Sequence, residues 1–153
     1  MGAGRLSEFR IRDENYRARV QDSYAHQSFL QSMGATISHI APGQVDIALS
    51  AREDLLQQHG YFHAGVTSTI ADSAAGYAAY SLFAAGDGVL TSEFKINLLS
   101  PAQGETLVAR GRVLKSGKQL TICASDVYGL QNGTQTHVAT GLFTLMRMEG
   151  MEA

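Results

Sequence analysis

The chain has no tryptophan, only two prolines and a single cysteine among its 153 residues. Because one cysteine cannot form an intramolecular disulfide, Cys123 fits a reducing compartment, and we expect a cytoplasmic location. The formal net charge is only −2, so the overall field favours neither nucleic acid nor an anionic membrane as a partner. The first residues also lack the apolar core of a signal peptide.

One long stretch of the chain, residues 66–85, is almost free of charge. It is rich in alanine and contains Asp72 as its single acidic residue. A run that is apolar all round predicts a helix that is buried on most sides. Asp72, three serine hydroxyls and Gly76 argue against a membrane span. Because burial of an unpaired carboxylate is costly, the position of Asp72 indicates a functional role.

The rest of the chain predicts one α+β domain over residues 1–153. A helix is predicted over about 13–33, where Tyr16, Val20 and Tyr24 recur at four-residue spacing. We expect the central helix to end near residues 86–88. Alternating apolar and polar residues predict six strands, over residues 35–40, 44–50, 90–98, 105–115, 120–130 and 135–148. The expected core, about 35–148, is an antiparallel sheet with one long helix against it.

Two inferences about partners follow from this arrangement. Five arginines near the N-terminus interleave with acidic residues, which favours a solvated face with ion pairs over nucleic-acid binding. The central helix is too apolar to face water on its far side, and a single sheet covers one side only. We therefore expect a homodimer as the minimum unit, and a homotetramer as the assembly.

A sequence motif surrounds the start of the central helix. Gln57 stands six residues before the triplet His63-Ala64-Gly65, and Asp72 stands nine residues after His63. These spacings and the order of elements resemble the hot-dog acyl-CoA thioesterases of the phenylacetate-pathway type, from about residue 29 to 146. Their pattern is Asn or Gln, then His-Gly-Gly, then Asp or Glu. Ala64 departs from it but retains the backbone N–H.

The resemblance implies hydrolysis of an acyl-CoA thioester to the free acid and CoA, at a dimer interface and without a metal or redox cofactor. Asp72 would act as general base or nucleophile, and the Ala64 N–H would donate to the oxyanion. Gln57 would orient the water or the substrate carbonyl. His63 would shape the loop, and Thr91 would lie near the water across the dimer interface.

The resemblance also implies residues that bind the substrate. Gly65 would give the loop-to-helix turn its conformational freedom. Lys115, Gly117 and Lys118 form a predicted hairpin tip, near which relatives often bind the nucleotide phosphates of CoA. Short, medium, long and aromatic acyl groups all remain open, because the pocket depends on how aromatic side chains pack across two subunits.

Each of these residues also has a simpler interpretation. Asp72 can be an acid stabilised by a helix terminus, Gln57 a surface glutamine and Thr91 an ordinary strand threonine. The lysines can serve only to solubilise an exposed turn. His59 and His63 are spaced like a metal pair and could form a three-ligand site with Asp72, but Gly60 indicates a loop where that geometry needs a helix.

Two other functions remain as alternatives. A hot-dog dehydratase or hydratase would pair a catalytic histidine with an acid, in a local pattern that is not found here. An acyl-CoA-binding regulatory module would usually carry a DNA-binding segment, and the single N-terminal helix has mixed charge.

Overall fold

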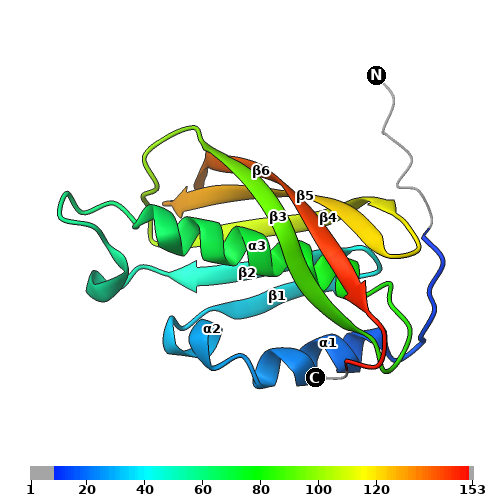
Figure 1. The fold of residues 1–153 in the computed structure, drawn as a ribbon. Coiled ribbons are helices and arrows are strands. Elements are labelled where there is room, and N and C mark those ends of the chain that lie inside the picture. The colour runs from blue at the N-terminus through cyan, green and yellow to red at the C-terminus, as the bar shows by residue number, and fades with distance from the viewer. Residues whose placement is uncertain (1–8, 152–153) are drawn as a thin grey trace.

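The computed structural model describes residues 9–151, in which an antiparallel sheet curves around one long helix, α3 (Ala64–Tyr80) (Figure 1). Two short helices, α1 (Tyr16–Ala25) and α2 (Ser28–Ser32), lie near β1 at one edge. The six strands follow the spatial order β1-β2-β4-β5-β6-β3. They are β1 (Thr36–Ala41), β2 (Gln44–Ser50), β3 (Gly88–Leu98), β4 (Thr106–Ser116), β5 (Leu120–Gln131) and β6 (Thr134–Met148). The predicted α+β hot-dog fold is confirmed.

The strands form where apolar and polar residues alternate. In β2, Val45, Ile47 and Leu49 are buried against α3, while the residues between them are only partly buried. Full burial of each such side chain contributes about 1.5–3 kcal/mol. Asn132 and Gly133 have φ angles of 48° and 75°, the left-handed pair of a two-residue hairpin, so the predicted turn between β5 and β6 is confirmed.

Helix α3 lies close to the sheet because its inner face carries small side chains. Ala71, Ala74 and Ala78 are fully buried there. Gly111 in β4 lies directly beneath, and a Cβ atom at that position would stand 2.3 Å from the Ala74 carbonyl oxygen. Any side chain at Gly111 would therefore push the helix off the sheet, and the alanine-rich sequence and this glycine together set the spacing of the layers.

Helix α3 ends at Tyr80, earlier than the predicted end near residues 86–88. The buried Ser81 stops it by donating a 2.7 Å hydrogen bond to the Ala78 carbonyl and accepting a 2.8 Å bond from the Gly43 N–H. The chain beyond then turns tightly. Gly43, the partner of the Ser81 hydroxyl, belongs to a distant turn, and periodicity along the chain does not reveal this contact.

The predicted helix over 13–33 is in fact two helices. His26 Nδ1 donates a 2.9 Å hydrogen bond to the Asp22 carbonyl, the acceptor that the His26 N–H would use in a continuing helix. The His26 N–H bonds to Ser23 instead. The chain therefore breaks before Gln27 and restarts as α2, with Leu30 buried.

Candidate active site

His63 caps the N-terminus of α3. Its Nδ1 accepts a 2.8 Å hydrogen bond from the Gly65 N–H, so a neutral imidazole here carries its proton on Nε2. Gly65 has an ordinary helical backbone, and the expectation that it supplies conformational freedom is wrong. Its role is steric, because a Cβ atom at residue 65 would stand 2.9 Å from His63 Nδ1. A side chain there would displace the histidine cap.

Ala64 is the first residue of α3 and is exposed. Alanine needs no left-handed backbone angles here, so the departure from glycine carries no strain. Within residues 9–151, the Ala64 N–H has no hydrogen-bond partner. A free N–H at a helix N-terminus, where the helix dipole is positive, can stabilise an oxyanion.

Gln57, His63 and Ala64 line one cavity of about 590 Å³, together with the aromatic residues Tyr61 and Phe62. The Gln57 amide oxygen accepts a hydrogen bond from the His59 N–H, which leaves its amide N–H groups to meet a bound group. The structure thus gathers three of the predicted site residues at the start of α3.

Asp72 lies in the middle of α3, half-buried, and Thr91 of β3 donates a 2.8 Å hydrogen bond to its Oδ1. Burial raises the pKa of the Asp72 carboxyl above its ordinary value, and the hydrogen bond from Thr91 lowers this pKa by a smaller amount. Asp72 lines a second cavity, of about 320 Å³, between α1, α3 and β3. A carboxylate with a raised pKa in a cavity is suited to general-base or nucleophilic chemistry.

The two groups of residues lie apart within one chain. Asp72 comes eight residues after Ala64 in the helix, which corresponds to about 12 Å along the axis. No residue of the Gln57–Ala64 group lines the cavities that Asp72 lines. Thr91, in contrast, reaches Asp72 inside the same chain.

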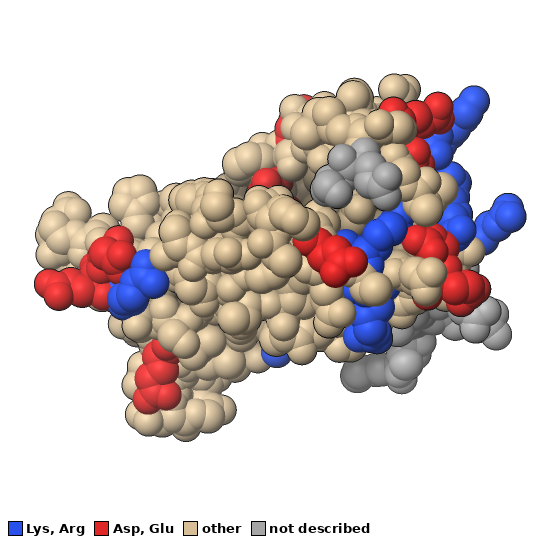
Figure 2. Space-filling view, turned by 90° about the horizontal axis from the view of Figure 1, so that it is seen from below, with Lys and Arg blue, Asp and Glu red and all other residues tan. Residues whose placement is uncertain are grey.

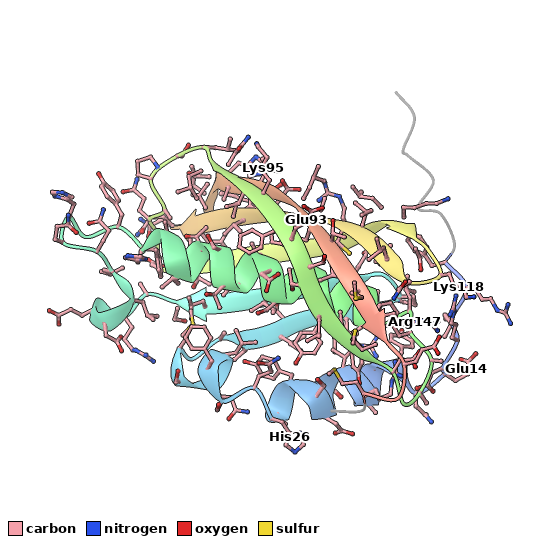
Figure 3. The ribbon with its side chains drawn as sticks, in the orientation of Figure 1. Glu14, His26, Glu93, Lys95, Lys118 and Arg147 are labelled. Atoms are coloured by element: carbon pink, nitrogen blue, oxygen red, sulfur yellow. The ribbon has the colours of Figure 1, made fainter. Side chains whose placement is uncertain are left out.

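The predicted hairpin tip lies between β4 and β5, and Lys115 and Lys118 are exposed there. Figure 2 shows one face of the molecule, on which the Lys and Arg side chains gather mostly toward one end, with acidic residues among them. Figure 3 places Lys118 at that end, beside Arg147 and away from the loop that precedes α3. Gly117 has a structural reason, since a Cβ atom there would stand 2.6 Å from the Leu120 carbonyl oxygen.

Two other titratable side chains, His137 and Cys123, take no part in this site. His137 pairs with an acid, since its Nε2 lies 3.0 Å from Asp126 Oδ1 on the adjacent strand. Burial raises the pKa of the Cys123 thiol to about 12, which makes it a poor nucleophile.

Arg19 is one of the five N-terminal arginines that were expected on a solvated face, but its side chain is only 14% exposed. It donates hydrogen bonds to the carbonyls of Tyr80, Phe83 and Ala84 just beyond α3. Only its long-range partners reveal this role.

In the part of the chain that the structure describes, no three His, Cys, Asp or Glu side chains gather closely enough to hold a metal ion. The alternative of a site built from His59, His63 and Asp72 therefore gains no support. Over the same residues, every helix falls short of a membrane span in length or apolar character.

The arrangement of a capped helix start, a mid-helix carboxylate and a curved sheet has parallels among known proteins. The family profile described as Thioesterase superfamily matches residues 59–135, half of the chain. The chain belongs to the Thioesterase superfamily. Acyl-coenzyme A thioesterase 13 of Homo sapiens and of Pongo abelii are each 30% identical to it over 99 residues, which are 64% of this chain and 70% of theirs.

Solved structures agree with this thioesterase assignment. A thioesterase family protein from Silicibacter pomeroyi is 42% identical, with a TM-score of 0.87, and the alignment covers 88% of this chain and 99% of that one. The PaaI protein from the phenylacetic acid degradation operon of E. coli has a TM-score of 0.80 at 23% identity, over 89% and 95% of the two chains. That second likeness concerns the fold.

Proposed function

We propose that this thioesterase-family protein hydrolyses an acyl-CoA thioester to the free acid and CoA. The observation that carries the proposal is the Asp72–Thr91 pair, a half-buried carboxylate held by a hydroxyl at the edge of a cavity. A water that enters the cavity could contact the carboxylate, and the raised pKa of Asp72 brings its basicity closer to that needed for proton removal.

The residues support two chemically balanced routes. As general base, Asp72 takes a proton from water while the water oxygen attacks the thioester carbonyl carbon; collapse of the oxyanion breaks the C–S bond, and the thiolate recovers the proton. As nucleophile, Asp72 attacks the same carbon and expels the thiolate, and water then hydrolyses the mixed anhydride. In both routes the carbonyl oxygen becomes negative and needs a donor such as the Ala64 N–H.

This donor and the base must act on one carbonyl group, although about 12 Å of helix separates them in one chain. A site completed by two copies resolves the conflict, with Ala64 and Gln57 from one subunit and Asp72 and Thr91 from the other. We therefore propose a homodimer with the active sites at its interface.

Strand β3, at one edge of the sheet, supports a location for the dimer interface. Among residues 9–151, strand β3 pairs only with β6, and its other edge is open. It carries Leu90, Phe94 and Leu98, each about half exposed. A long apolar edge strand invites pairing with a second copy. Two-fold pairing would run the partner in the opposite direction, which brings the hairpin end of one subunit toward the loop end of the other.

That geometry also supports a place for the nucleotide. Lys118 and Arg147 line a cavity of about 430 Å³ at the hairpin end. Lysine is a point-charge partner for phosphate, so we propose that Lys118, with Lys115 and Gly117 beside it, meets the phosphates of CoA. We also propose further association into a tetramer and a cytoplasmic location. The proposed reaction needs no metal or redox cofactor, because water and side chains supply all the chemistry.

The first test is release of free thiol from a set of short, medium, long and aromatic acyl-CoA esters, with the carboxylic acid identified as the second product. Detection of the acid separates hydrolysis from a hydratase or a binding module, neither of which yields it. An absence of thiol release across the set would refute the proposed function.

A second experiment tests the shared site. Asp72→Asn and Ala64→Pro subunits, each inactive alone, are mixed and allowed to exchange. In a mixed dimer with shared sites, one site contains both substitutions and the other contains neither, so activity returns. If each site lies within a single chain, every site keeps one defect and the mixture stays inactive. Light scattering on a sizing column checks that dimers form at micromolar concentration.

A further inference from the structure

The cavity of about 320 Å³ beside Asp72 has two chemically different ends. Asp72 and Thr91 stand at one end, on α3 and β3. Ser23 and Gln27 of the N-terminal segment stand at the other, together with Tyr77, one and a half turns farther along α3. The cavity therefore runs from the proposed reacting group toward α1.

Gly76 keeps this cavity open. It lies in the interior of α3, where glycine disfavours the helix by roughly 1 kcal/mol relative to alanine. Unlike Gly111, it has no close neighbour, because a Cβ atom at residue 76 would meet nothing within 4 Å. Its backbone angles are helical, so conformation does not require glycine either. The empty volume of the cavity is the reason that remains for the absence of a side chain.

The far end of the cavity is polar, with Tyr77 buried, Ser23 partly buried and Gln27 exposed. Tyr77 is only 4% exposed, and its hydroxyl lies 3.3 Å from the Ser23 hydroxyl. Gln27 also hydrogen-bonds to the Tyr77 hydroxyl, and the Ser23 hydroxyl keeps hydrogen-bonding positions for a bound group. The Gln27 amide also lines the cavity. A ligand that displaces water from this end needs an atom that hydrogen-bonds to these groups, because desolvated groups without partners are costly.

The α1 wall of the cavity is held firmly. Arg19 of α1 donates 2.5 and 3.0 Å hydrogen bonds to the carbonyls of Ala84 and Phe83, and its guanidinium stands 4.7 Å above the Tyr80 ring. Asp13 lies 3.0 Å from its Nε. A cation that satisfies free carbonyls beyond a helix end is favourable, so Ser23 on α1 is presented at a fixed place.

We infer that this cavity receives the acyl group and selects a short one that bears a hydroxyl at its far end. The inference rests on the proposed function, since Asp72 would act on the thioester at the near end. The volume is close to the lower limit of about 300 Å³ for ligand pockets, and α1 closes the direction in which a long chain would extend. The hydroxyl would bond to Ser23 and Tyr77.

The test compares kcat/KM for matched pairs of CoA esters that differ by one hydroxyl. The aliphatic pair is hexanoyl-CoA and 6-hydroxyhexanoyl-CoA, and the aromatic pair is 3-phenylpropanoyl-CoA and 3-(4-hydroxyphenyl)propanoyl-CoA. We expect the hydroxylated member of at least one pair to be preferred about tenfold, the value of one well-formed hydrogen bond. The pair that shows the preference identifies the carbon skeleton.

Two variants assign that preference to the cavity. Ser23→Ala and Tyr77→Phe should each reduce it, because they lower kcat/KM for the hydroxylated esters more than for the unsubstituted ones, whereas the exposed Ser28→Ala serves as the matched control. Equal rates for both members of both pairs, with normal Asp72-dependent hydrolysis, would overturn the inference and leave the proposed function standing. Loss of all hydrolysis in the wild-type protein would refute the function itself.

Gly76→Ala provides an independent measurement. The added methyl group favours the helix and occupies the cavity, so the variant should melt at a higher temperature and lose kcat/KM on the larger acyl groups. Acetyl-CoA, whose acyl group does not extend past Gly76, is the control substrate. Unchanged rates on every ester would show that the acyl group does not pass Gly76.

Discussion

Thr91 on the edge strand β3 donates a 2.8 Å hydrogen bond to Oδ1 of Asp72 in the middle of α3. This bond lies between the two elements that flank the cavity, and it opposes the effect of burial on the pKa of Asp72. Burial disfavours the carboxylate, whereas a hydroxyl donor favours it. The pKa is raised overall, so burial is the larger effect.

Thr91→Val should move the acid side of the pH–rate profile to higher pH. The substitution keeps the shape of the side chain but removes the donor, and the pKa of Asp72 then rises further. Since either route needs the carboxylate form, activity appears only as the pH rises through this pKa. The measurement is kcat/KM from pH 4 to 9, with Thr36→Val on β1 as the control. A profile that does not move would show that Thr91 has no influence on the active group.

Asp72→Asn should lower kcat by about 10²–10⁴, the usual value of general-base assistance, and leave KM nearly unchanged. The amide keeps the shape and accepts the Thr91 hydrogen bond, but it can neither take a proton nor attack. Asp72→Glu retains the charge on a longer arm and should keep partial activity. A folded Asp72→Asn protein with near-normal turnover would end the proposed mechanism.

The same variant makes a prediction about stability. Because the folded-state pKa of Asp72 is raised, the folded protein binds its proton more tightly than the unfolded chain does. The penalty for the buried charge is therefore absent below the unfolded pKa of about 3.9 and is complete once the pH exceeds the folded pKa. Urea melts should show Asp72→Asn more stable than wild type at pH 7, with the difference vanishing near pH 3.

The sequence alone predicts those features that depend on local pattern. Alternation locates all six strands, and the uncharged run from residue 66 locates the core helix with Asp72 inside it. The pattern does not predict the break at His26, the end of α3 at Ser81 or the burial of Arg19. Each depends on hydrogen bonds to carbonyls or N–H groups whose positions are known only after the chain has folded.

The site is predicted in part for the same reason. Motif spacing selects Gln57, His63, Ala64 and Asp72 as candidates, but it is measured along the chain. The eight helical steps from Ala64 to Asp72 span about 12 Å, which is too far for one carbonyl group. A glycine beside a loop suggests free backbone angles, but the structure gives Gly65 a steric reason instead. Ser23 and Tyr77 are 54 residues apart in sequence, and no motif connects them.

Lys118→Ala should raise KM for CoA esters about two- to fivefold with little change in kcat. An exposed lysine contributes a modest, salt-screened attraction, and phosphates far from the thioester are held equally in the ground and transition states. Lys115→Ala should act in the same direction more weakly. Esters of pantetheine, which lack the nucleotide, should be unaffected.

The control for this substitution is Arg17→Ala on the exposed face of α1, which removes one positive charge elsewhere. If Lys118→Ala impairs CoA and pantetheine esters equally, the hairpin does not hold the nucleotide.

Ala64→Pro is a direct test of the proposed oxyanion donor, because proline removes one N–H group and changes little else. Ala64 is the first residue of α3, the helical position that best accepts proline. The preceding His63 has φ −60° and ψ 140°, the extended conformation that a residue before proline prefers. Since the Ala64 N–H has no partner within residues 9–151, no structural hydrogen bond is lost. The melting temperature should therefore stay near that of the wild type.

The rate should respond very differently from the stability. Loss of one oxyanion donor typically lowers kcat by about 10²–10³, and KM should change little because the donor acts mainly in the transition state. Ala64→Gly keeps the N–H and restores the residue that the family pattern has there, so it should retain activity. A proline variant that is folded and hydrolyses acyl-CoA as fast as Ala64→Gly would remove the Ala64 N–H from the mechanism, and the donor would then have to be His63 Nε2 or the Gln57 amide.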